Sequence, residues 1–257
     1  MTKLYGAVAP KYGMNLLGGS PNPEDVGIIQ QKGLNRKHIF DSVKASLKRL
    51  QLDYIDLLQC HRFDYDTPIE ETMQALHDVV QAGYVRYIGM SSCWAYQFHA
   101  MQNYAIQNKL TPFISMQNHH NLVYREEERE MFPTLKMFGV GSIPWSPLAR
   151  GVLTRPMDEQ KATTRSQTDV WFKLYVGAGT PDIVNRVEEI AKKKGITMAQ
   201  VAIAWSLSKP GVTAPIVGTT SLKNLEDIIG AVEVQLTEEE IKYLEEPYQP
   251  TATAGHM

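Results

Sequence analysis

Hydrophobic and polar positions along the chain follow two alternating patterns, one typical of amphipathic helices and one typical of short buried strands. Apolar side chains recur at helical spacing over residues 36–50, and Asn35 directly before them can cap the first turn. Residues 54–60 are almost continuously apolar, as in a strand that is covered on both faces. The first regular part of the chain is therefore predicted to be a helix followed by a strand.

The next predicted helix carries several start and stop signals. Thr67 can serve as its cap, Pro68 suits the first helical position, and Glu70 can close a capping box. Gly83 is a suitable residue for the end of a helix. These signals predict a helix over residues 67–83.

The alternation of strands and helices continues to the end of the chain. Further strands are predicted at 85–90, 113–117, 140–145 and 214–218, and further helices at 94–107, 125–138, 181–194, 197–208, 221–231 and 237–246. A strand fragment is also expected at Leu4-Tyr5, whereas residues 6–34 are rich in glycine and proline and are typical of a loop. Strands that alternate with helices indicate parallel βαβ units.

Two architectures fit this pattern, a doubly wound sheet and a (β/α)8 barrel. The first would carry a GxGxxG motif after an early strand, and this sequence has none. In a barrel, chemistry is placed where strands run into loops. Polar residues follow five strands here, namely His61, Ser91-Ser92, Gln117-Asn118, Ser146 and Thr219-Thr220-Ser221. This favours an α/β (β/α)8 (TIM) barrel, and since no linker interrupts the pattern, residues 1–257 are predicted to form a single domain.

Composition and charge narrow the class of protein. The 257 residues are 43% hydrophobic and 21% charged, which suits a globular domain, and the net charge of −2 argues against nucleic acid or an anionic membrane as the main partner. No signal peptide and no apolar run long enough to span a membrane is found. Two cysteines, Cys60 and Cys93, lack metal or disulfide spacing, so the expectation is a reducing, cytoplasmic location and no metal site.

His61 is the sharpest single candidate for chemistry. It ends a buried strand, and alternation places Leu57, Gln59 and His61 on one face, with Leu58 and Cys60 on the other. A neutral imidazole at this position can polarise a carbonyl group or relay a proton. The alternative is a histidine that only caps a loop. Cys60 is better explained as a small core residue than as a nucleophile.

Two further segments have a functional and a structural interpretation. Residues 218–221 join a strand to a helix start, so their backbone N–H groups and the charge of Lys223 suit a phosphate; alternatively, Ser221 simply caps the helix. Trp145 can stack on a flat ring or pack as a core or rim aromatic. His119 and His120, as neighbours, face opposite ways, which favours packing roles over metal binding. Lys3 alone would be unremarkable.

Taken together, these segments resemble the aldo-keto reductase superfamily. Residues 53–62 resemble the segment that ends in the family's active-site histidine. Residues 83–92 resemble the next strand, whose serine pair holds the nicotinamide carboxamide together with a glutamine matched by Gln117. Residues 145–151 resemble the segment that stacks on nicotinamide and wraps the pyrophosphate, and 216–225 resemble the loop that holds the adenosine 2′-phosphate. The resemblance runs from residue 1 to about 246 and points to the fungal aryl-alcohol dehydrogenase or versiconal-type branch.

The resemblance implies an NADPH-dependent oxidoreductase that reduces an aldehyde or ketone to an alcohol, with a small-molecule carbonyl or alcohol as its partner. His61 would orient the carbonyl, and Lys3, in a matching Thr-Lys pair, would tune a proton donor. The implied cofactor-binding residues are Ser91, Ser92, Gln117, Trp145, Ser146, Leu148, Arg150, Gly218, Thr219, Thr220, Ser221, Lys223, Asn224 and Asp227.

The sequence departs from the family pattern at its start. The family's aspartate and proton-donating tyrosine belong to earlier βα units, and nothing here matches them. The expectation is a barrel that lacks its first two βα units, has exposed strand edges that encourage self-association, and reacts about 10²–10⁴-fold more slowly. Three explanations compete: a truncated form of an active enzyme, a degenerate copy, or an NADPH-binding regulatory module similar to the aldo-keto-like β subunits of potassium channels.

Overall fold

The computed structural model describes residues 1–7, 25, 27–160, 174–175 and 177–256. Contacts between residues divide the chain into two compact units. Unit 1 is Met1–Gln117 with Gly255–Met257, and unit 2 is Asn118–Ala254. None of the helices described in either unit is both long enough and apolar enough to cross a membrane.

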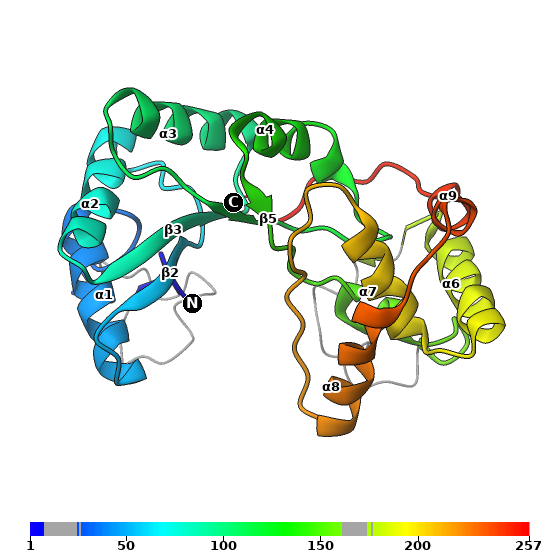
Figure 1. Ribbon diagram of the computed structural model, residues 1–257. Helices are drawn as coiled ribbons and strands as arrows, with labels where there is room; N and C mark the ends of the chain where they lie inside the picture. The colour runs from blue at the N-terminus through cyan, green and yellow to red at the C-terminus, as the bar shows by residue number, and fades with distance from the viewer. Residues whose placement is uncertain (8–24, 26, 161–173, 176, 257) are drawn as a thin grey trace. The chain divides into compact units, whose positions relative to one another are not determined.

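Unit 1 contains a parallel sheet with helices between its strands (Figure 1). In chain order its elements are β1 (Thr2–Leu4), α1 (Arg36–Leu50), β2 (Ile55–Cys60), α2 (Ile69–Gln81), β3 (Val85–Ser91), α3 (Ala95–Gln107) and β4 (Ser115–Gln117). β1 pairs with β2, β2 with β3 and β3 with β4, all parallel. α2 packs against both α1 and α3. The predicted parallel α/β architecture is confirmed, and it is consistent with a (β/α)8 barrel.

The first helix forms as its sequence predicts. The side chain of Asn35 accepts a hydrogen bond from the backbone N–H of His38 at 2.9 Å and so satisfies one of the free donors at the helix start. Ile39 and Val43, one turn apart, are completely buried. Burying a side chain of this size contributes about 1.5–3 kcal/mol relative to leaving it in water, so the apolar stripe fixes which face of α1 meets the core.

The predicted capping box at the start of α2 is wrong. The helix begins at Ile69 after Pro68, and no side chain caps it. The hydroxyl of Thr67 instead donates to the carboxylate of Asp64 at 2.7 Å. The same carboxylate accepts from the backbone N–H of Leu34 at 2.6 Å. Asp64 thus binds Thr67 and Leu34 together and connects the loop after β2 to a segment about 30 residues earlier in the chain. A local sequence signal does not reveal such a contact.

Unit 2 is mainly helical. Its elements are η3 (Glu126–Glu128), α4 (Met131–Phe138), β5 (Gly141–Ser142), η4 (Ala149–Thr154), α6 (Thr180–Lys194), α7 (Met198–Ser208), α8 (Leu222–Ile229), η7 (Gly230–Glu233) and α9 (Glu238–Glu245). α6 packs against α7 and α9 (Figure 1). Val187, Val201 and Trp205 are fully buried in the core that these helices share. Thr197 and Thr237 begin α7 and α9 with capping boxes.

The two predicted strands of unit 2 are much shorter than expected. Of residues 140–145 only the two residues of β5 are in a strand, and residues 214–218 take part only in an isolated bridge. Pro144 and Pro215 lie inside these segments and lack a backbone N–H, so neither segment can extend a regular ladder through them.

The predicted helix over 125–138 is divided into η3 and α4. Pro133 explains the division, because a proline is tolerated only in the first turn of a helix, where its ring meets no preceding helical carbonyl. α4 begins at Met131, which places Pro133 in that turn.

Candidate active site

The strand register of unit 1 places two rows of residues on one face of the sheet. Paired strand positions form the inner row, which consists of Lys3, Gln59, Gly89 and Ser115. The outer row lies two residues after the last three of these positions and consists of His61, Ser91 and Gln117. Residues two apart on a strand share a face, so all four of the predicted residues Lys3, His61, Ser91 and Gln117 belong to the same face. His61 continues the ladder, since its N–H donates to the carbonyl of Leu4 at 2.8 Å.

Gln117 is the centre of the hydrogen bonds at this end of the sheet. Its backbone carbonyl accepts from the hydroxyl of Ser91 at 2.7 Å and from the N–H of Ser92 at 3.1 Å. Its side-chain amide donates to the side-chain oxygen of Gln59 at 2.9 Å. The structure therefore brings together the predicted residues Ser91, Ser92 and Gln117. The hydroxyl proton of Ser91 is used within the protein, which leaves its oxygen to act as an acceptor.

The cationic groups near these rows are shifted toward their neutral forms. Burial, followed by the charges of Lys3 and Arg62, lowers the pKa of His61 to about 4. Burial and the charge of Arg62 lower the pKa of Lys3 to about 8. At neutral pH the imidazole is therefore neutral and the ammonium is still mostly charged. This pair can offer a hydrogen bond and a positive charge to a polar group in front of the sheet.

The thiol of Cys60, unlike His61 and Lys3, is not suited to take part in a reaction. It is fully buried, and burial raises its pKa to about 12, so the reactive thiolate is strongly disfavoured. Within the described residues, no three histidine, cysteine or acidic side chains lie close enough to hold a metal ion.

A cavity of about 530 Å³ in unit 2 gathers seven of the predicted cofactor-binding residues. These are Ser146, Leu148, Arg150, Gly218, Thr219, Asn224 and Asp227. The cavity also includes Thr154, Arg155 and Thr197, which sequence reasoning missed. Its walls come from η4 with the residues on either side of it, the start of α7, residues 216–219 and α8. The size is within the usual range for sites that bind small molecules or cofactors.

Local backbone geometry shapes one wall of this cavity. Ser146 has a positive φ of 55°, and its carbonyl accepts from the side-chain amide of Asn121 at 2.9 Å. Arg150 and Gly151 also have positive φ, 55° and 103°, which interrupts η4. For a residue other than glycine this conformation is uncommon and often marks a functional site. Arg150, at this turn, lines the cavity together with Arg155 five residues later, so two positively charged residues border a space where an anion could bind.

The cavity is also lined by Asp227, whose carboxylate is held in place. The hydroxyl of Thr197 donates to Asp227 at 2.9 Å, and the backbone carbonyl of Asp227 accepts from the side chain of Gln200 at 2.8 Å. A fixed acceptor in the same cavity as two cationic residues suits a ligand that has both anionic groups and hydroxyl or amine donors.

Three of the predicted phosphate-site residues, Thr220, Ser221 and Lys223, are not among the residues that line the cavity. The hydroxyl of Ser221 accepts from the N–H of Asn224 at 3.3 Å and caps α8, as the structural interpretation predicts. The side chain of Lys223 is exposed in the first turn of that helix.

Trp145 lies in a stack of aromatic rings. Its indole is nearly parallel to the imidazole of His119, with ring centres 4.0 Å apart, and the other face of His119 stacks on Tyr124, also at 4.0 Å. His119 bonds the hydroxyl of Tyr175 at 2.7 Å, and His120 contacts Glu128 at 2.8 Å. The two neighbouring histidines thus pack in different surroundings, in line with the packing roles expected from the sequence.

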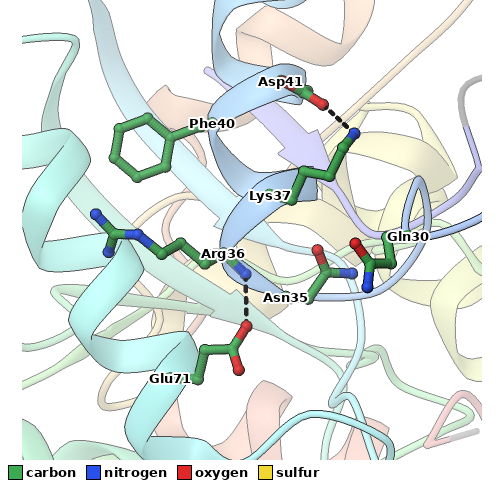
Figure 2. A pocket seen from close by; sticks show the side chains of 7 residues that line it. All are labelled: Gln30, Asn35, Arg36, Lys37, Phe40, Asp41 and Glu71. Carbon is green, nitrogen blue, oxygen red and sulfur yellow. Dashed lines mark hydrogen bonds and ion pairs between the residues drawn. The ribbon is translucent and has the colours of Figure 1, made fainter.

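A second cavity, of about 500 Å³, lies at the start of α1 in unit 1 and contains none of the predicted site residues (Figure 2). Its charged groups are matched within the protein. Lys37 pairs with Asp41 at 2.7 Å, and the backbone N–H of Arg36 donates to Glu71 at 3.0 Å. The guanidinium of Arg36 forms an ion pair with Asp78. This pairing leaves little net charge to attract an ionic ligand.

The chain is similar in sequence to known proteins over almost its whole length. A model of the aldo/keto reductase family matches residues 23–249. A Schizosaccharomyces pombe protein named as an aryl-alcohol dehydrogenase is 50% identical over 258 residues, which cover 100% of this chain and 71% of that protein. Versiconal hemiacetal acetate reductase of Aspergillus parasiticus is 48% identical over 262 residues, which cover 98% of this chain and 74% of that protein. A Saccharomyces cerevisiae protein named as an aryl-alcohol dehydrogenase is 45% identical, with 97% and 73% covered.

Proposed function

This chain belongs to the aldo/keto reductase family of oxidoreductases, and from that premise we propose that it reduces an aldehyde or ketone to an alcohol with NADPH as the reductant. The observation that carries the proposal is the cavity of unit 2. Seven residues expected to bind the cofactor line it, and two arginines border it. Members of the family generally use a nicotinamide cofactor, and two guanidinium groups suit its phosphates.

The residues fit such a cofactor in chemical type. In unit 2, Arg150 and Arg155 would bind the diphosphate, and Asp227 would accept a hydrogen bond from the adenosine part. In unit 1, Gln117 supplies an amide that can bind the nicotinamide carboxamide, with Ser91 and Ser92 holding its backbone in place.

When bound, NADPH supplies a hydride to the carbonyl carbon. The neutral imidazole of His61 would donate a hydrogen bond to the carbonyl oxygen and so orient the substrate. The ammonium of Lys3 would stabilise the negative charge that grows on this oxygen as the carbon is reduced. The alkoxide then takes up a proton from water to give the alcohol. Residues 1–257 are proposed to act as a single domain in this reaction, in the cytoplasm.

A second candidate is an NADPH-binding module with little turnover. It is favoured by the surroundings of Lys3, where burial and the charge of Arg62 lower the pKa to about 8 and so weaken the charged form of this lysine.

One experiment separates these functions. NADPH is titrated against tryptophan fluorescence, and the oxidation of NADPH is then followed with benzaldehyde and other aromatic aldehydes. Binding with turnover supports the reductase, and binding without turnover supports the module. Arg150→Met should weaken binding by about 10-fold or more, because a charge-assisted hydrogen bond contributes about 1.5–3 kcal/mol. Arg186→Met, at a guanidinium outside the cavity, is the control. Absence of binding by the wild type would overturn both candidates.

A further inference from the structure

Gln59 occupies an unusual place for a polar side chain, since it is completely buried in the middle of the sheet of unit 1. Its side-chain oxygen accepts from the amide of Gln117 at 2.9 Å, and Gln117 is only 2% exposed. A buried amide is costly unless it forms hydrogen bonds. The contact with Gln117 satisfies the oxygen of the Gln59 amide, whereas the nitrogen of that amide is buried without a hydrogen-bond partner among the described residues.

The neighbours of Gln59 in the inner row leave room for this contact. A Cβ atom added to Gly89 would lie 2.4 Å from the hydroxyl oxygen of Ser115 and 3.2 Å from the side-chain nitrogen of Gln59. The first distance is far shorter than any ordinary contact. Glycine at position 89 and a small residue at 115 thus provide the space in which the long side chain of Gln59 can extend toward Gln117, one row further along the sheet.

The contact also fixes which way the amide of Gln117 points. An amide has a donor end and an acceptor end that diverge from the same carbon. Since the nitrogen of Gln117 donates to Gln59, its oxygen is directed elsewhere and remains an acceptor. The backbone of Gln117 is fixed as well, by Ser91 and Ser92. The backbone carbonyl and the side-chain nitrogen of Gln117 are thereby both held by the protein.

We infer that Gln59 is a positioning residue that sets the amide of Gln117 so that its oxygen accepts a hydrogen bond from the NH₂ group of the nicotinamide carboxamide. The inference rests on the proposed function, because it assumes that a nicotinamide cofactor binds. It adds a specific claim about recognition: the protein recognises the donor end of the carboxamide through an acceptor that Gln59 orients.

The test uses two cofactors that differ at that group alone, NADPH and its 3-acetylpyridine analogue, in which a methyl group replaces the NH₂. The wild type should bind NADPH up to about 10-fold more tightly, the effect of one neutral hydrogen bond. In Gln59→Met, which has similar volume but cannot form the amide contact, this preference should fall below about twofold. Dissociation constants come from tryptophan fluorescence, and circular dichroism confirms folding.

Two further variants make the result specific. Gln102→Met is the matched control, because Gln102 is an equally buried glutamine in unit 1 whose amide bonds the backbone of Phe113; it should keep the full preference. Gln59→Glu retains an acceptor at the same position and should keep part of the preference. If Gln59→Met misfolds, Gln59→Glu decides the matter alone: loss of the preference in that folded variant overturns the inference.

The outcomes also separate this inference from the proposed function. If the wild type binds NADPH but shows no preference over the analogue, or if folded Gln59→Met keeps the preference, the role of Gln59 is overturned and the reductase proposal stands. If the wild type binds neither cofactor, the proposed function fails and the inference fails with it.

Discussion

Burial disfavours the charged forms in two clusters of partly buried groups in this chain, but only in one of them does burial decide the outcome. In unit 1, burial lowers the pKa values of Lys3, His61 and Arg62, and the repulsion among these groups adds to the shifts of Lys3 and His61. In unit 2, burial would raise the pKa of Glu128, yet hydrogen bonds from His120 and Arg125 lower it to about 2. The cations of the first cluster are driven toward their neutral forms, whereas Arg125 and Glu128 of the second are held in their charged forms.

The difference comes from the partners. Arg125 holds both carboxylate oxygens of Glu128, at 3.0 and 2.7 Å, and also contacts Glu245 at 3.1 Å. Lys209 completes the network through Glu245 at 2.8 Å. Charges that are paired in this way belong to the architecture of the helices around them. Charges that are desolvated without an opposite charge nearby are more typical of sites where chemistry or binding takes place. The comparison therefore separates a candidate active site from a structural network.

The largest expected effect tests whether the cluster of unit 1 performs chemistry. His61→Ala should lower turnover of an aromatic aldehyde by about 10²–10⁴-fold, because the substrate loses the group that orients its carbonyl. NADPH affinity, measured by fluorescence, should change less than about twofold. His77→Gln is the control, since His77 bonds Thr111 on the same unit and has no proposed role in catalysis. If His61→Ala kept a turnover within tenfold of the wild type, the cluster of unit 1 would not be a catalytic site.

The next effect tests whether the cluster of unit 2 is structural. Glu128→Gln removes the charge that Arg125 and His120 share, and breaking a buried pair costs about 3–5 kcal/mol. Glu128 retains 24% of its side-chain exposure, so solvent screening reduces the expected loss of unfolding free energy to about 1–3 kcal/mol. Urea denaturation measures it. Glu188→Gln, at a pair with the exposed Lys192, should cost no more than about 0.5 kcal/mol. If both variants lost the same unfolding free energy, the cluster of unit 2 would be no more structural than an exposed ion pair.

Acid titration sharpens the comparison, because the two clusters lose stability in different pH ranges. The pKa of His61 falls from 6.5 to about 4, so the unfolded chain binds a proton first and stability decreases as the pH falls from 6.5 to 4. The pKa of Glu128 falls from 4.5 to about 2, so its contribution is complete above pH 4.5 and is lost as the pH falls toward 2. Each contribution is roughly 1–2 kcal/mol after allowance for screening.

Variants assign these pH ranges to residues. Urea denaturation at several pH values should show a flatter profile between pH 6.5 and 4 in His61→Asn, and between pH 4.5 and 2 in Glu128→Gln. His38 and His120, whose pKa values burial also lowers, contribute in the upper range. The informative quantity is therefore the difference between wild type and variant. A His61→Asn profile parallel to that of the wild type would contradict the assignment.

Local signals in the sequence predict most of the helices, because a cap needs only residues that are close along the chain. Asn35 and Ser221 cap their helices as predicted. Prediction fails where a distant residue competes or where a ladder is interrupted. The carboxylate of Asp64 takes the hydroxyl of Thr67, and Pro144 and Pro215 lie within the segments expected to be strands. Such competition depends on tertiary structure, which a local pattern does not contain.

The candidate site shows the same limit. The resemblance to the family identifies Gln117 and Arg150, which lie in segments that match its motifs. It does not identify Arg155 or Thr197, which join the cavity from other elements, although Arg155 follows Arg150 by only five residues. Strand alternation places Gln59 on the face of His61 but assigns it no role, since only the structure shows its bond to Gln117.

The smallest expected effect concerns Lys223, which is exposed at the start of α8 and does not line the cavity. If it contacts the adenosine 2′-phosphate, Lys223→Gln should weaken NADPH binding by at most about fivefold, because an exposed ion pair contributes up to about 1 kcal/mol. NADH has no such phosphate, so its affinity should not change, and the effect on NADPH should shrink as salt is raised. Lys242→Gln, a lysine on α9, controls for the change in net charge. Equal effects on NADPH and NADH, or none on either, would leave α8 with only the helix-capping role of Ser221 and would restrict phosphate binding to the two arginines of the cavity.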